Sequence, residues 1–155
     1  MTLDLATVRA TMPRTVPMVA TLGLEFLVLS DDHAVLRLPD DPVYRNHVGG
    51  PHAGAMFTVA ETASGALVLA HYGELLDVLT PLPIEATVRY LKVALGPVTA
   101  TARFAEPIDD VLARFEAGER PEFVIDVELT TGEADERLVT GSMSIRWTLR
   151  PRRRD

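Results

Sequence analysis

Residues 53–70 read AGAMFTVAETASGALVLA, and nearly every position in this stretch is apolar or small. A helix of this composition is buried on most sides, so the sequence predicts a central helix from about residue 52 to residue 70. Its small side chains allow a sheet or a second subunit to approach closely. Five positions at spacings of three and four predict one polar and glycine stripe along it: Gly54, Thr58, Glu61, Thr62 and Gly65.

The sequence on both sides of this helix changes to a two-residue period. After it, four segments alternate apolar with polar side chains, at 84–90, 98–104, 123–129 and 139–147. Such alternation is typical of antiparallel strands with one covered face. Before it, 24–29 and 34–38 flank turn residues and predict a hairpin. The order predicts an α+β domain in which one helix covers an antiparallel sheet.

The remaining segments complete this prediction. Residues 3–12 have helical spacing behind Thr2 as a cap, and Pro13 is expected to break that helix. A short helix follows at 16–22, and Gly23 ends it. Residues 39–51 read as an irregular loop, and 108–118 as a surface helix between two strands, capped by Asp109 or Asp110. We expect one domain over residues 1–149 and a basic tail over 150–155.

Composition excludes several classes of protein. The chain has 155 residues, 47% of them hydrophobic, which suits a single domain with its own core. Fifteen basic and 22 acidic residues give a net charge of −7, which disfavours nucleic-acid binding. There is no cysteine, so disulfides and thiolate metal sites are excluded. No secretory signal and no apolar run of about 18 residues is apparent, so we expect a cytoplasmic protein without a membrane partner.

Glu61 is the one charged side chain in the central helix. Carboxylates are rarely buried unless they are paired, hydrogen-bonded or functional. A carboxylate in an apolar cleft binds its proton more tightly, which suits a general base or a nucleophile. The alternative is that Glu61 meets solvent or an arginine.

The start of the same helix could supply a second functional group, a site for an oxyanion. First-turn amides and the helix dipole favour a developing oxyanion, and Ala53 and Gly54 carry little bulk there. The two groups are separated by roughly 11–12 Å along the helix, about two turns. This is too far for both to act on one carbonyl from one helix. A second copy running antiparallel would bring its Glu61 beside the first copy's N-terminus, so the spacing suggests a shared dimer site.

The spacing of five residues resembles the signature of hotdog-fold acyl-CoA thioesterases of the phenylacetate-pathway type. That signature places an Asn, a Gly three residues on, a His three further, glycines, and an acid nine residues after the His. The residues that match it here are Asn46, Gly49, His52, Gly54 and Glu61. Residues 22–25 and 90–92 are also similar to the family, and the resemblance extends over about residues 18–148, closest to a poorly characterised branch.

The resemblance implies a helix wrapped by a strongly curved antiparallel sheet, a homodimer, and often a dimer of dimers. It further implies that the amide of Ala53 polarises the thioester carbonyl and that Glu61 acts from the other subunit. Asn46 would hold the attacking water or the carbonyl. Ala53 replaces the family's usual glycine, and Glu61 replaces its usual aspartate.

The other candidates have weaker signals. His52 could act as a base or orient the loop. Thr62 or Ser64 could hydrogen-bond Glu61 or the thioester, or simply pack. Three basic strand residues, Arg89, Lys92 and Arg103, are open candidates to contact the coenzyme A phosphates. Of these, Lys92 is grouped with Gly49 and Gly54 for substrate binding. Four scattered histidines predict no metal site, and we expect no cofactor beyond the coenzyme A of the substrate.

The predicted function is hydrolysis of an acyl-CoA to a carboxylic acid and free CoA. Two alternatives remain open at this point. One is a hotdog hydratase or dehydratase, and the other is a non-catalytic acyl-CoA-binding or oligomerisation module.

Overall fold

The computed structural model describes residues 3–132 and 136–152. Along the chain its elements are α1 (Leu5–Thr15), α2 (Pro17–Thr21), β1 (Glu25–Leu29), β2 (His33–Leu38), η1 (Pro42–Tyr44), α3 (Ala53–Tyr72), η2 (Gly73–Leu75), β3 (Leu79–Tyr90), β4 (Val98–Phe104), α4 (Asp109–Glu116), β5 (Glu122–Thr131) and β6 (Leu138–Pro151).

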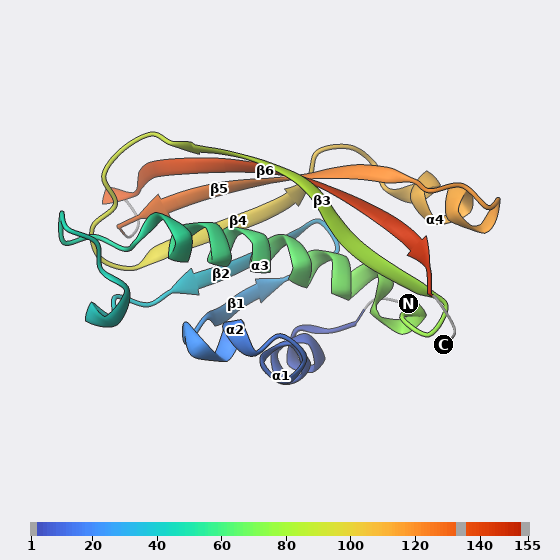
Figure 1. Cartoon of the computed structure of the whole chain (residues 1–155), viewed down its shortest axis with the longest axis horizontal. Coiled ribbons are helices and arrows are strands. Elements are labelled where there is room, and N and C mark those ends of the chain that lie inside the picture. Colours follow the sequence, from blue (N-terminus) through green and yellow to red (C-terminus); the bar gives the residue numbers. More distant parts are fainter. Residues whose placement is uncertain (1–2, 133–135, 153–155) are drawn as a thin grey trace.

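Within the described residues, the strands form one antiparallel sheet of six strands in the order β1-β2-β4-β5-β6-β3. The sheet curves around α3, and α1 and α2 lie beside β1 (Figure 1). The predicted α+β arrangement of a central helix wrapped by an antiparallel sheet is therefore confirmed. The β1–β2 hairpin and the short helix between β4 and β5 also lie where the sequence predicted them.

The core forms between α3 and the middle of the sheet. The side chains of β5 alternate as predicted, and its apolar face is buried against the helix. Small residues on α3 let the strands approach closely, and these residues are fully buried: Ala60, Ala63, Ala66 and Ala70. Burying a large apolar side chain contributes about 1.5–3 kcal/mol, so the buried face of the sheet stabilises the fold against α3.

The central helix with η2, Ala53–Leu75, is long and apolar enough to cross a membrane by length and composition alone. It contains no unbroken apolar run of about 18 residues, because Thr58, Glu61 and Thr62 interrupt it, as the sequence indicated. In the structure 61% of its most apolar window is buried. The sheet covers that surface, so α3 has the environment of a core helix.

Strand β3 departs from the predicted pattern. It begins at Leu79, earlier than expected, and a register shift between Pro83 and Glu85 interrupts its pairing with β6. It lies at the edge of the sheet, and nearly all of it is exposed or half-buried on both faces. Ile84 is 42% exposed, so the expectation of a covered apolar face is wrong for this strand within one chain.

Strand β6 also differs at its start. Val139 is 36% exposed whereas Thr140 is fully buried, the reverse of the predicted alternation. The pairing with β5 shifts between Leu129 and Thr130. A bulge adds one residue to one strand and reverses the direction of side chains beyond it, which a two-residue period cannot reveal.

The N-terminal helix corrects two details. Pro13 lies inside α1, which continues to Thr15, because a proline this near the helix end removes only a final-turn hydrogen bond. The cap is Asp4, whose carboxylate accepts a hydrogen bond from the Thr7 amide at 2.7 Å. Thr2 lies outside the described residues.

Two further predictions from the sequence concern α4 and the chain end. Helix α4 starts without a side-chain cap, so Asp109 and Asp110 occupy its first turn instead of capping it. Of the expected tail at 150–155, Arg150 and Pro151 end β6, and residues 153–155 lie outside the described residues.

Candidate functional site

The loop before α3 is folded tightly on itself. Residues Arg45 and Pro51 form an isolated bridge, and the Asn46 amide donates to the Gly50 carbonyl at 2.7 Å. The Asn46 side chain braces the same loop: Oδ1 accepts from the Val48 amide at 3.0 Å, and Nδ2 donates to the Pro51 carbonyl at 3.1 Å. A primary amide has two N–H groups and two lone pairs. Among residues 3–132 and 136–152, one N–H and one lone pair of the Asn46 side chain therefore have no partner.

Two glycines let this loop take its shape. Gly49 has φ +83°, a conformation that L side chains rarely adopt. A Cβ on Gly50 would lie 2.0 Å from the Ala94 carbonyl oxygen, so only glycine fits there. Gly50 thus brings the loop into contact with the segment that follows β3.

His52 organises the first turn of α3. Its backbone amide donates to the Tyr44 carbonyl at 2.8 Å, and its Nδ1 accepts from the Gly54 amide at 2.9 Å. Its carbonyl accepts from the amides of Ala55 and Met56. His52 is therefore the N-cap of the helix, and its Nδ1 is the capping acceptor.

The amide of Ala53 differs from its neighbours. Within residues 3–132 and 136–152 it donates a hydrogen bond to no protein acceptor. The peptide group to which it belongs is polarised, because the His52 carbonyl accepts two hydrogen bonds. Such an amide at a helix N-terminus is a suitable donor to an anionic oxygen.

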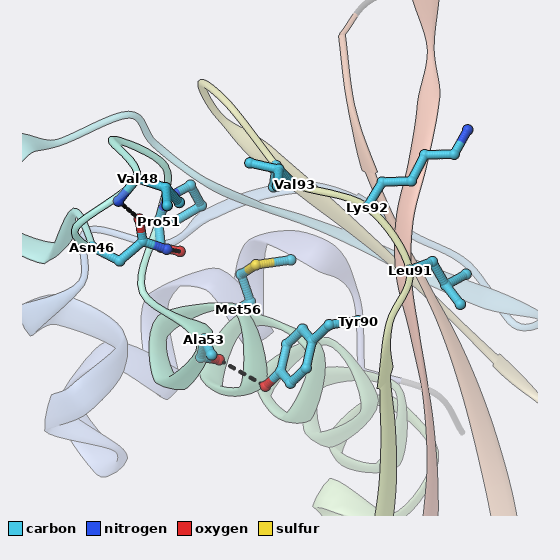
Figure 2. Close-up of a pocket in the computed structure, with 10 residues that line it drawn as sticks. Asn46, Val48, Pro51, Ala53, Met56, Tyr90, Leu91, Lys92 and Val93 are labelled. Carbon is cyan, nitrogen blue, oxygen red and sulfur yellow. Dashed lines mark hydrogen bonds between the residues drawn. The ribbon is translucent and has the colours of Figure 1, made fainter.

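A cavity of about 480 Å³ opens beside Ala53. Figure 2 shows Asn46, Val48 and Pro51 on one side of it and the chain after β3 on the other, with Met56 pointing into the space from α3. The Tyr90 hydroxyl donates to the Ala53 carbonyl at 3.1 Å and joins the end of β3 to the helix start. The side chain of Lys92 points away from Ala53, so its ammonium group is at the rim.

A second cavity, of about 460 Å³, lies against the same first turn. It is bounded by α2, by η1 and by the start of α3; its lining includes Met18, Leu22, Val43, Tyr44, His52 and Gly54. Sequence analysis missed α2 and Tyr90 as parts of the site. Tyr90 belongs to the family-like residues 90–92 but follows the strand alternation, and residues 16–22 read only as a short helix, so neither was assigned a role in the site.

Glu61 lies in neither of these cavities. It is half-buried and lines a third one of about 420 Å³, where Phe57 lies beside it on α3 and Ile84 and Glu85 face it from β3. Burial raises the pKa of its carboxyl group above the ordinary value. Among the described residues, its carboxylate forms no salt bridge and accepts no hydrogen bond. One chain therefore holds the Ala53 amide and the Glu61 carboxylate apart.

Two other predicted site residues lie in the core. Thr62 and Ser64 are buried, and neither lines one of the cavities described above. The Ser64 hydroxyl donates to the Glu61 carbonyl at 2.7 Å and accepts from Trp147 Nε1 at 3.2 Å. Through these contacts the Ser64 hydroxyl joins α3 to β6 inside the core. The described residues also contain no cluster of three or more potential metal ligands.

Comparisons with known proteins agree with this geometry. A family model described as "Domain of unknown function (DUF4442)" matches residues 6–149. A Pseudomonas aeruginosa protein of unknown function, called a probable thioesterase, is 27% identical with a TM-score of 0.83, over 98% of this chain and 99% of that chain. Among curated proteins, none is significantly similar.

Two more distant structures share the fold. A thioesterase family protein from Silicibacter pomeroyi is 22% identical with a TM-score of 0.74, over 92% of this chain and 94% of that one. The Escherichia coli PaaI protein from the phenylacetic acid degradation operon is 15% identical with a TM-score of 0.70, over 92% and 90%. The structural neighbours are hotdog-fold proteins of the thioesterase families, so the fold and the resemblance inferred from sequence are confirmed.

Proposed function

Because the chain belongs to the family described as a domain of unknown function, DUF4442, and has the fold of hotdog thioesterases, we propose that it hydrolyses acyl-CoA thioesters to a carboxylic acid and free CoA. The observation that carries this proposal is the Ala53 amide. It is a polarised helix N-terminal donor without a protein acceptor among the described residues, and it lies at the wall of an apolar cavity.

In the proposed reaction the Ala53 amide donates to the thioester carbonyl oxygen. A water molecule attacks the carbonyl carbon while Glu61 removes its proton, and negative charge develops on the oxygen that Ala53 faces. The C–S bond then breaks as the carbonyl re-forms, and the proton passes to the departing sulfur. Asn46 has one N–H and one lone pair that no described residue engages, and these can orient the water.

The acid in this scheme comes from a second copy of the chain. Glu61 follows Ala53 by eight positions, which correspond to about 12 Å of helix, and the two residues line separate cavities. A homodimer with antiparallel α3 helices brings each carboxylate to the other copy's first turn. Exposed edge strands and exposed apolar side chains favour pairing with another chain, and β3 with Ile84 offers both beside Glu61.

The direct test is thiol release from a panel of acyl-CoA thioesters, measured with a thiol-reactive dye. Thiol release from at least one thioester, faster than its spontaneous hydrolysis, is the expected outcome. If the protein binds acyl-CoA in calorimetry but releases no thiol from any member of the panel, it is a binding module and the proposed hydrolysis is wrong.

A further inference from the structure

The first turn of α3 separates two cavities of similar size. Ala53 lines the one beside β3, whereas His52 and Gly54 line the one beside α2. A thioester carbonyl bound at this turn carries two substituents, the acyl group and the sulfur of the pantetheine arm, which point in different directions from the carbonyl carbon. The two cavities beside the Ala53 amide could therefore hold the two substituents of the carbonyl, the acyl group in one and the pantetheine arm in the other.

The charge of the two cavities distinguishes them. Lys92, at the rim of the cavity beside β3, is exposed and forms no salt bridge with any described residue. The cation of the other cavity, Arg45, is neutralised by Asp40 through two hydrogen bonds of 3.1 and 2.9 Å. Coenzyme A carries phosphate anions, so its arm is favoured beside Lys92 and an uncharged group is favoured beside Arg45.

The cavity beside α2 has an apolar lining with exposed side chains. Met18 and Leu22 are four residues apart and so share one face of the α2 segment, and both line the cavity. Met18 is 53% exposed, and Val43 across from it is 80% exposed. Large apolar side chains grouped in a concave surface mark a binding site, and methionine adapts to ligands of different shape. A volume of about 460 Å³ is within the range of small-molecule sites.

We propose that α2 and η1 form the acyl pocket, that it accepts uncharged apolar acyl groups, and that the pantetheine arm leaves past Lys92 on the other side of the turn. This assignment rests on the proposed function. Met18 and Val43 are then the residues that set acyl-chain preference. Each buried methylene changes affinity by about fourfold, so filling the pocket has a large effect on long chains and little effect on short ones.

The test measures binding and turnover for free CoA, acetyl-CoA and octanoyl-CoA with three variants. Met18→Trp fills the pocket, and Val43→Trp does so from a side chain whose exposure leaves little packing to lose. Val16→Trp adds the same bulk beside α2 but outside the cavity. The two pocket variants are expected to raise the Kd of octanoyl-CoA at least tenfold while the Kd of free CoA stays within twofold, and Val16→Trp is expected to do neither. Lys92→Gln should weaken all three ligands by a similar factor.

Several results would overturn the assignment. One is an equal loss for free CoA and octanoyl-CoA in both pocket variants, and another is a change of chain preference in Lys92→Gln. A pocket variant that turns the dimer into a monomer would make α2 a subunit contact instead. Selective loss of octanoyl-CoA binding without thiol release in the wild type would keep the pocket and reject the hydrolysis. Thiol release with unchanged preference in both pocket variants would keep the hydrolysis and reject the pocket.

Discussion

Strands β5 and β3 carry the same alternation of apolar and polar residues, but they have opposite surroundings. Ile125 of β5 is fully buried between neighbouring strands and α3, whereas Ile84 of β3 is 42% exposed at the edge of the sheet. Alternation predicts a strand and the faces of its side chains, but it does not reveal what covers them. A single chain therefore leaves the apolar side chains of the edge strand β3 uncovered, next to the half-buried carboxylate of Glu61.

Helix α3 repeats this asymmetry. Its closed side, with Val59 and Ala63, is fully buried against the sheet, whereas Gly54 and Phe57 are exposed on its open side and Glu61 is half-buried there. If the open side is where a second copy completes the site, substitutions on the closed side should cost stability and those on the open side should cost activity.

The largest effect is expected from Ile125→Ala. Removing a fully buried isoleucine loses transfer free energy and leaves a cavity, so the free energy of unfolding should fall by about 2–5 kcal/mol. Ile84→Ala is the matched variant on the open edge and should weaken dimer formation much more than it destabilises the monomer. Urea denaturation at several protein concentrations, with sedimentation equilibrium, measures both. Equal losses of monomer stability would show that the two strands do not differ in the way described.

Glu61→Gln should lower turnover at least about 10²-fold, as loss of a positioned acid or base typically does, without destabilising the fold. The control is Glu85→Gln, because Glu85 lines the same cavity and is exposed. Thiol release and thermal melting of both variants check this. Near-normal turnover of Glu61→Gln would remove Glu61 from the mechanism.

The pH dependence of stability should also depend on Glu61. Burial raises its pKa, so the folded state favours the protonated carboxyl group. Its contribution to stability is then present below the unfolded pKa and is lost as the pH rises through the raised folded pKa. Relative to Glu61→Gln, the wild type should lose melting temperature over that interval. Melting curves from pH 4 to pH 8 check this, and a constant difference between the two proteins would contradict it.

A smaller effect is expected from Asn46→Ala. This change removes two loop hydrogen bonds and the remaining polar sites of the amide, so turnover should fall by about tenfold with a small decrease in melting temperature. Asn46→Asp keeps the acceptor for the Val48 amide and serves as the control for the loop. A large loss of stability at unchanged specific activity would show that Asn46 only stabilises the loop and takes no part in turnover.

How far the sequence could predict the molecule differs between its parts. The small residues of α3 and the alternation of β5 predicted helix, strand and burial, because local period and core packing agree there. The predicted burial of Val139 and Ile84 was wrong. A bulge in β6 turns the Val139 side chain to the other face of the sheet, and the edge position of β3 leaves Ile84 without a covering element. Both depend on strand pairing that no local pattern records.

The sequence likewise indicated only some residues of the candidate site. Spacing along α3 indicated Ala53 and Glu61, and the structure keeps them in separate cavities. Ser64 was included because it lies near Glu61 in sequence, but it is buried and hydrogen-bonded to Trp147. Tyr90 and Met18 were missed because they reach the first turn through tertiary contacts.

The central claim is that the oxyanion donor and the acid come from different copies of the chain. It is tested most directly by co-refolding Glu61→Gln with Ala53→Pro. Proline suits this position, because Ala53 is the first residue of α3, its amide has no protein acceptor among the described residues, and His52 before it is already extended. Each variant alone should fold, dimerise and be inactive.

A mixed dimer has one site with both changes and one with neither. Under random pairing, half of the dimers are mixed and each has one intact site, so thiol release should return to about a quarter of the wild-type rate. If verified mixed dimers remain inactive, the donor and the acid act within one chain, and the shared site is contradicted.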